Sequence, residues 1–210
     1  MAVQRKVFYR RNLPHWQPAE TDFFVTYRLA GSLPVSKIIE IKERYSKLKN
    51  LPQNLSKEKQ EELNENYFTE FNELLDRNLN EPYWLREKQI GKTVLDSLLF
   101  NHNKTYFLWC ACIMPNHVHV LLSTLKKAPS LDVILQNHKK FTALHCNRLL
   151  RRDGQFWERE SYDRIIRNDE HFNSTVHYIL NNPVKAGFAK RWQDWELLYI
   201  DEKLRKEFEF

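Results

Sequence analysis

The sequence predicts a single α+β domain in which helices pack on an antiparallel sheet. Two apolar strands form a predicted hairpin near the middle of the chain, and segments with helical apolar spacing lie on both sides of it. The length of 210 residues corresponds to about one domain, numbered 1–210, and 42% hydrophobic residues can supply its core. Four glycines and 29% charged residues exclude collagen-like, low-complexity and disordered classes.

Short runs of strand-forming residues predict four strands. The first is the apolar run 23–29, which ends before Pro34. The hairpin pairs 105–112 with 117–122 through a turn at Met114-Pro115-Asn116. Residues 157–166 alternate loosely and are the last predicted strand.

Apolar spacing predicts five helices, at about 36–50, 63–75, 90–101, 131–150 and 169–181. We expect the last helix to end before Pro183, because proline disfavours helical geometry in the residue that precedes it. Residues 36–82 are charge-balanced and helical, so we interpret them as an insertion into a compact domain. Residues 191–210 form a C-terminal tail without a motif.

Composition favours a cytoplasmic protein without a membrane span. Three cysteines imply no disulfide framework and fit a reducing compartment, and the N-terminus lacks the apolar segment of a signal peptide. Residues 105–125 carry no formal charge and are long enough to cross a bilayer. Pro115, Asn116 and two histidines in the middle of this stretch argue against a span.

Positive charge is concentrated in two segments. The chain has a net charge of +6, and the excess of basic residues lies in residues 1–35 and in 126–167. The second segment contains 10 basic and 5 acidic residues. A surface built from both segments would attract a polyanion, most commonly nucleic acid. An ordinary solvated surface is the alternative.

His117 and His119 are the first candidates for chemistry. On a strand they point to the same face, so both imidazoles can chelate one metal ion and leave it open to substrate. Ligands on an open sheet surface support little of the core, so alanine at either position should leave folding intact. A partly exposed histidine pair is one alternative, and a zinc site with Cys110 and Cys112 is another, although C-x-C on a strand is more typical of core residues.

Tyr178 and Asn182 are the second pair of candidates. They are four residues apart and therefore share one helix face. The amide oxygen of Asn182 could be a third metal ligand, and the Tyr178 hydroxyl could reach a metal-bound phosphate. Tyr178 could equally be a core aromatic, since helical spacing alone cannot single it out among nine tyrosines.

Three segments together resemble a known family. They are Met114-Pro115-Asn116-His117-Val118-His119-Val120-Leu121-Leu122, Phe156-Trp157-Glu158-Arg159-Glu160-Ser161-Tyr162-Asp163-Arg164-Ile165-Ile166-Arg167, and Tyr178-Ile179-Leu180-Asn181-Asn182-Pro183-Val184-Lys185-Ala186-Gly187. Their order and spacing resemble the REP-associated tyrosine transposases, relatives of the single-tyrosine insertion-sequence transposases among the HUH endonucleases. The resemblance covers residues 20–35 and 83–190.

The resemblance implies a ferredoxin-like antiparallel sheet with helices on one face and the HUH strand at its centre. It implies that His117 and His119 bind Mg²⁺ or Mn²⁺, that Tyr178 is the nucleophile, and that Asn182 takes the place of a third polar ligand. The implied reaction cuts single-stranded DNA near a hairpin, such as a REP-like palindrome, through a 5′-phosphotyrosine. The enzyme would be a monomer or a homodimer.

The implied DNA partner suggests which other residues bind. Trp84, Trp157 and Tyr162 are candidates for stacking on bases. We expect the insertion to lie away from the scissile phosphate. The basic candidates for phosphate contacts are Lys139, Lys140, Arg148, Arg151, Arg159, Arg164, Arg167 and Lys185.

Three other interpretations stay open at this point. The chain could be a catalytically silent, sequence-specific DNA-binding protein. It could be an RRM-like module that stacks bases on Tyr106, Phe107 and Trp109. It could also be a replication initiator or relaxase of the same HUH chemistry.

Overall fold

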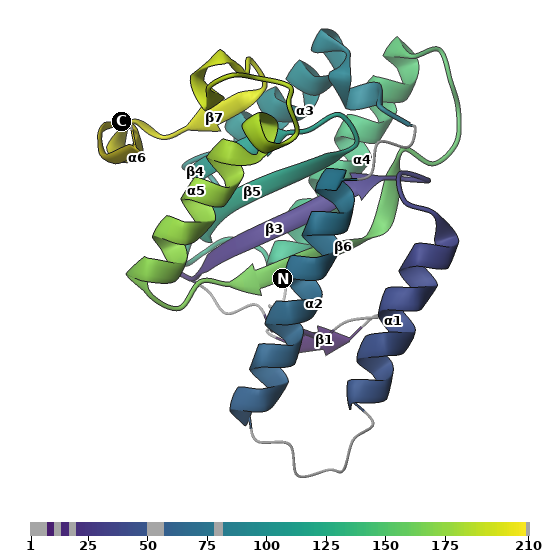
Figure 1. The fold of residues 1–210 in the computed structure, drawn as a ribbon. Coiled ribbons are helices and arrows are strands. Elements are labelled where there is room, and N and C mark those ends of the chain that lie inside the picture. The colour runs from purple at the N-terminus through teal and green to yellow at the C-terminus, as the bar shows by residue number, and fades with distance from the viewer. Residues whose placement is uncertain (1–7, 11–13, 17–19, 50–56, 78–81, 209–210) are drawn as a thin grey trace.

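A five-stranded antiparallel sheet forms the centre of the computed structural model, which describes residues 8–10, 14–16, 20–49, 57–77 and 82–208 (Figure 1). The order of its strands is β6-β3-β5-β4-β7. These strands are β3 (Asp22–Leu29), β4 (Tyr106–Ile113), β5 (His117–Thr124), β6 (Trp157–Ile165) and β7 (Leu198–Ile200). A separate small sheet pairs β1 (Phe8–Arg10) with β2 (Pro14–Trp16).

The strand that carries the two histidines is the central strand. β5 pairs with β3 on one side and β4 on the other, with His119 opposite Thr26 and Cys112. Side chains alternate along β5, so Val118 and Val120 enter one core while the histidines face the other. Both cores are built from buried apolar residues, and the sheet is therefore covered on both faces.

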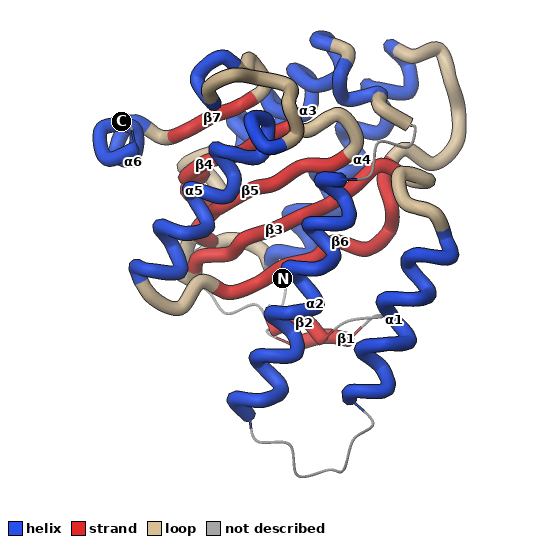
Figure 2. The backbone as a smooth tube through the Cα atoms, in the orientation of Figure 1, coloured by secondary structure: helices blue, strands red, loops and turns tan. Residues whose placement is uncertain are grey.

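Different helices cover the two faces of the sheet. The core behind Val118 and Val120 includes residues of α3 (Lys88–Asn101) and α4 (Leu131–Leu149). The core on the histidine face includes residues of α2 (Lys57–Arg77) and α5 (Asp169–Lys185). Figure 2 shows these two layers on either side of the strands. The α+β fold class is confirmed, and α2 and α5 add a second layer to the one-sided arrangement that we expected.

The segment that we interpret as an insertion contains two helices, α1 (Val35–Lys49) and α2, which lie next to each other (Figure 1). Aromatic contacts attach α2 to the sheet. The Phe71 ring stacks on Tyr162 of β6 with centroids 3.7 Å apart, and Phe68 meets Phe24 of β3 edge-on at 4.9 Å. Residues 50–56, between the two helices, lie outside the described ranges.

The helix that carries Tyr178 extends further than the sequence predicts. α5 continues through Pro183 to Lys185, so the expected end before Pro183 is wrong. Proline costs little here because it lies in the last turn, where only one backbone hydrogen bond is lost. The Ala186 amide still bonds the Asn182 carbonyl, and Gly187 ends the turn with a positive φ of 74°.

The C-terminal tail also has defined structure. It contains β7, which pairs with β4 at the edge of the sheet, and α6 (Glu202–Phe208), whose Leu204 and Phe208 are buried. Two 3₁₀ turns, Trp84–Arg86 and Trp192–Asp194, complete the elements. Across the described ranges, none of the helices combines the length and apolar character needed to cross a membrane.

Candidate metal and nucleophile site

The two histidines are buried and held in a defined orientation. Their exposed fractions are 1% and 0%, so the expectation of an exposed pair on an open sheet surface is wrong. His117 Nδ1 lies 2.7 Å from Asn116 Oδ1, and His119 Nδ1 lies 2.9 Å from Thr26 Oγ1. A neutral imidazole that donates from Nδ1 presents its lone pair at Nε2. In the tautomer that carries the proton on Nδ1, the two Nε2 atoms, 3.0 Å apart, present their lone pairs toward one another.

Asp76, near the end of α2, completes this cluster and was not predicted. Its Oδ1 lies 3.2 Å from His117 Nε2 and 3.5 Å from His119 Nε2. In the Nδ1–H tautomer these would be three acceptor atoms, which repel one another unless a proton or a cation lies between them. The three side chains form a group that could hold a metal ion.

Asn182 of α5 lies at the same cluster, as the sequence predicts. Its Nδ2 lies 3.0 Å from Asp76 Oδ1 and 3.2 Å from His119 Nε2, whereas its buried Oδ1 has no hydrogen-bond partner. The oxygen and nitrogen of an amide have the same shape, and a half-turn of the amide group exchanges them. That half-turn would direct the amide oxygen toward a cation between these residues.

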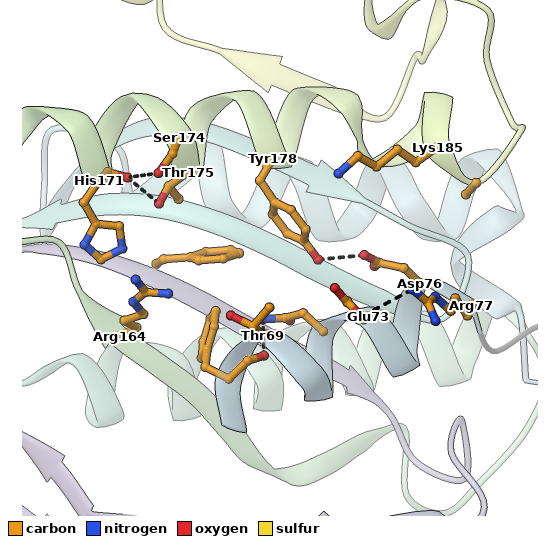
Figure 3. Close-up of a pocket in the computed structure, with 14 residues that line it drawn as sticks. Thr69, Glu73, Asp76, Arg77, Arg164, His171, Ser174, Thr175, Tyr178 and Lys185 are labelled. Carbon is orange, nitrogen blue, oxygen red and sulfur yellow. Dashed lines mark hydrogen bonds and ion pairs between the residues drawn. The ribbon is translucent and has the colours of Figure 1, made fainter. Parts of the chain in front are cut away.

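Tyr178 stands beside the cluster on the same helix. Its hydroxyl donates a hydrogen bond of 2.7 Å to Asp76 Oδ2 (Figure 3). Its ring packs edge-on against Phe24 and His119, with centroids 5.7 and 5.3 Å away. Burial, followed by the negative charge of Asp76, raises the pKa of Tyr178 well above 10. The hydroxyl is therefore protonated, and a nearby cation would make it easier to ionise.

Burial and hydrogen bonds together set the charge states of His119 and Asp76. It lowers the pKa of His119 to about 4, so this imidazole is neutral at pH 7 and able to bind a metal. Burial opposes ionisation of Asp76, but hydrogen bonds with His117 and His119 outweigh it and hold the Asp76 pKa below its usual range. At pH 7 the cluster thus contains one carboxylate and a neutral His119.

Two alternatives from the sequence do not fit this geometry. Tyr162, predicted to stack on bases, is 4% exposed, and its ring stacks on Phe71 instead. Cys110 and Cys112 are fully buried on β4, and burial raises the pKa of both thiols. Among the described residues, the group that could hold a metal ion consists of Asp76, His117 and His119, without either cysteine.

A pocket of about 410 Å³ opens beside Tyr178, between α2 and α5 (Figure 3). Figure 3 shows Arg164 and His171 at one end and Asp76, Arg77 and Lys185 at the other. The pocket is lined by Phe24, Phe68, Thr69, Asn72, Glu73, Asp76, Arg77, Arg164, His171, Ser174, Thr175, Tyr178, Lys185 and Ala186.

The structure places only part of the predicted basic set at this pocket. Arg164 and Lys185 line it, and Lys185 Nζ lies 5.5 Å from the centroid of the Tyr178 ring. Arg167 is exposed just beyond β6, and Arg159 is exposed on that strand. Lys139 instead donates to the backbone carbonyls of residues 158 and 160, and so ties α4 to β6.

Lys140, Arg148 and Arg151 lie elsewhere. They are exposed on α4 or just after it, and α4 covers the sheet face opposite the histidines. The predicted stacking aromatics have structural partners as well. Trp157 is buried and donates to Thr142, and Trp84 stacks on Phe156 at 5.4 Å.

The chain is similar to proteins of one family in both sequence and structure. No family model matches it. A curated Haemophilus influenzae protein named REP-associated tyrosine transposase is 27% identical over 93 residues, which are 40% of this chain and 53% of the relative. The matched segment thus spans about half the length of that protein. A solved REP-associated tyrosine transposase bound to a REP hairpin matches 90% of this chain and 80% of its own, with a TM-score of 0.52 and 16% identity. At that identity the structural match shows a shared fold.

Proposed function

We propose that this protein, which is similar to the REP-associated tyrosine transposases, is a metal-dependent enzyme that cuts and rejoins single-stranded DNA beside a hairpin. The observation that carries this proposal is the convergence of His117, His119 and Tyr178 on one point. The two Nε2 atoms lie 3.0 Å apart, and the Tyr178 and His119 rings are in contact at 5.3 Å. A metal ligand pair next to a tyrosine hydroxyl is the arrangement that nucleophilic attack on a phosphodiester requires.

His117 and His119 would hold a divalent ion, Mg²⁺ or Mn²⁺, through Nε2, with the amide oxygen of Asn182 as a further ligand. Such an ion polarises a phosphoryl oxygen and stabilises the charge that develops in the transition state. Asn116 and Thr26 fix the imidazoles from behind through Nδ1, at 2.7 and 2.9 Å. This support fits a site whose ligands must not move during the reaction.

Tyr178 would attack the scissile phosphorus through Oη. The Oη–P bond forms, the bond from phosphorus to the 3′ oxygen breaks, and the 3′ oxygen takes up a proton as a free hydroxyl. The 5′-phosphotyrosine keeps the energy of the phosphodiester, so the strand can be rejoined without ATP. The phenolic proton must leave before or during attack, and Asp76 Oδ2 already accepts its hydrogen bond at 2.7 Å.

Basic residues around the pocket would hold the DNA strand. Arg164 and Lys185 line the pocket, and their charges suit phosphates on either side of the reacting one. A hairpin fits as the partner because the solved structure with the same fold is described as bound to one. The residues on α4 would serve only DNA that reaches the other face of the sheet.

A cleavage assay on a labelled hairpin oligonucleotide with a single-stranded flank tests the proposal. Wild-type protein should cut the flank in Mn²⁺ or Mg²⁺ and stop when EDTA is added, and His117→Ala should not cut. The exposed Lys92→Ala variant on α3 is a control that should cut normally. Tight binding without cleavage under all conditions would instead support a silent DNA-binding or RRM-like protein.

A further inference from the structure

The insertion reaches the centre of the site through Asp76. We infer that Asp76 joins the cation site to the nucleophile, with one carboxylate oxygen as a metal ligand and the other holding the Tyr178 hydroxyl. The inference rests on the proposed function and adds a working role for α2. It also departs from the expectation that the insertion lies away from the scissile phosphate, because Asp76 of α2 is hydrogen-bonded to Tyr178.

The first support is the division of contacts between the two carboxylate oxygens. Oδ1 lies 3.2 and 3.5 Å from the Nε2 atoms of His117 and His119. Oδ2 accepts from Tyr178 at 2.7 Å. An ionised carboxylate has lone pairs on both oxygens, so it can bind a cation and a hydroxyl at the same time. A shift of α2 would therefore alter both contacts together.

The second support is the charge of the ligand set. Neutral imidazoles and an amide bring no negative charge to a cation, whereas Mg²⁺ and Mn²⁺ favour carboxylate oxygen. Within the described part of the chain, Asp76 is the carboxylate in the metal-binding group. Its side chain is 17% exposed, so its charge is less screened than that of a surface residue.

The third support is that packing fixes the position of Asp76. Phe68, Asn72 and Asp76 are four residues apart and share one face of α2, and Phe68 and Asn72 are 6% and 2% exposed. Leu75, next to Asp76, is 1% exposed. Together with the stack of Phe71 on Tyr162, these contacts leave α2 little freedom to move. Asp76 is therefore placed by the core of the protein.

Glu73 provides a matched control on the same helix. It lines the same pocket one turn before Asp76, but it is exposed and pairs with Arg77 at 3.3 Å. A general effect of negative charge near the pocket would be altered by changes at both positions. A specific role in the site would be altered only by changes at Asp76.

The test is calorimetric titration of Mn²⁺ alone into wild type, Asp76→Asn, Asp76→Glu, Glu73→Gln and Tyr178→Phe. Asp76→Asn should weaken Mn²⁺ binding at least about tenfold, Asp76→Glu should restore part of the loss, and Glu73→Gln should bind as wild type. Tyr178→Phe should shift the affinity when Asp76 is present. It should have no further effect in the Asp76→Asn background, because the shared carboxylate is gone.

Wild-type Mn²⁺ affinity in a folded Asp76→Asn variant would overturn the inference. Additive effects of Asp76→Asn and Tyr178→Phe on that affinity would overturn it as well. If Asp76→Asn does not fold, the comparison of Asp76→Glu with Glu73→Gln carries the same test. DNA cleavage is measured in parallel. Unaltered metal binding and cleavage in Asp76→Asn would remove the inference and leave the proposed function. If the wild-type protein does not cleave DNA, the proposed function is removed, while the titration still reports on metal binding by Asp76.

Discussion

Replacing His119 with alanine should destabilise the protein even without metal, because this imidazole is fully buried. Removing the ring leaves a cavity, which by comparison with other large-to-small changes costs about 2–4 kcal/mol of unfolding free energy. Thr26 loses its 2.9 Å partner, and Asp76 loses its contact with His119 Nε2 at 3.5 Å. Both losses add to the effect of the cavity, so we expect a value in the upper part of that range.

Metal should widen this difference. A cation present at a hundred times its dissociation constant stabilises the protein that binds it by about 2.7 kcal/mol, and it should do little for His119→Ala. Urea unfolding in EDTA and in saturating Mn²⁺ measures both quantities. Val118→Ala, which changes the neighbouring side chain on the opposite face of β5, is the control that should lose stability but keep the metal-dependent gain. Equal stabilisation of wild type and His119→Ala by Mn²⁺ would show that His119 is not a ligand.

Three further predictions concern DNA binding, pH and the insertion. The affinity for hairpin DNA should fall with salt concentration, with a log–log slope of several units. Arg164→Ala and Lys140→Ala should each weaken binding to all DNA sequences about equally if the side chain contacts phosphate. Filter binding at several salt concentrations measures this, and an affinity that does not change with salt would mean that these charges face solvent. Stability in EDTA should fall as the pH drops from about 6.5 toward 4, because burial lowers the pKa of His119 to about 4 and that of His138 to about 3, so the unfolded chain binds protons first; urea midpoints that do not change over this range would contradict it. Deleting 51–62 with a short linker should preserve cleavage, because Phe68, Phe71 and Leu75 still anchor α2; a folded deletion variant that cannot cut would show that the start of α2 is needed.

The sequence predicts the fold well because its signals are local. Alternation on β5 and helical spacing in α3, α4 and α5 depend on which residues are neighbours along the chain. His117 and His119 could be found in the same way, from their spacing on one strand, whereas Tyr178 was singled out only by the resemblance of three segments to a known family. Burial of the histidines could not be predicted, because the layer that covers them comes from a different segment.

Asp76 was missed because its role depends on tertiary packing. In the run Asn72-Glu73-Leu74-Leu75-Asp76-Arg77, it resembles any acidic residue on a solvated helix. One signal was available, since Asp76 continues the face formed by Phe68 and Asn72, and a charge on an apolar face usually has a partner. The predicted end of α5 before Pro183 failed for the opposite reason. The local rule for the residue before proline was outweighed by a helix end in which Ala186 bonds the Asn182 carbonyl and Gly187 has a positive φ.

The measurement that tests the central claim most directly is the identity of the residue that becomes linked to DNA. Hairpin oligonucleotide labelled on the 5′-phosphate side of the cut is incubated with protein and Mn²⁺, resolved on a denaturing gel, and the adduct is mapped by peptide mass spectrometry. Wild type and Tyr162→Phe should carry the label on the peptide that contains Tyr178, and Tyr178→Phe should fold, bind DNA and carry none. An adduct that survives in Tyr178→Phe, or cut DNA without any adduct in wild type, would contradict the account.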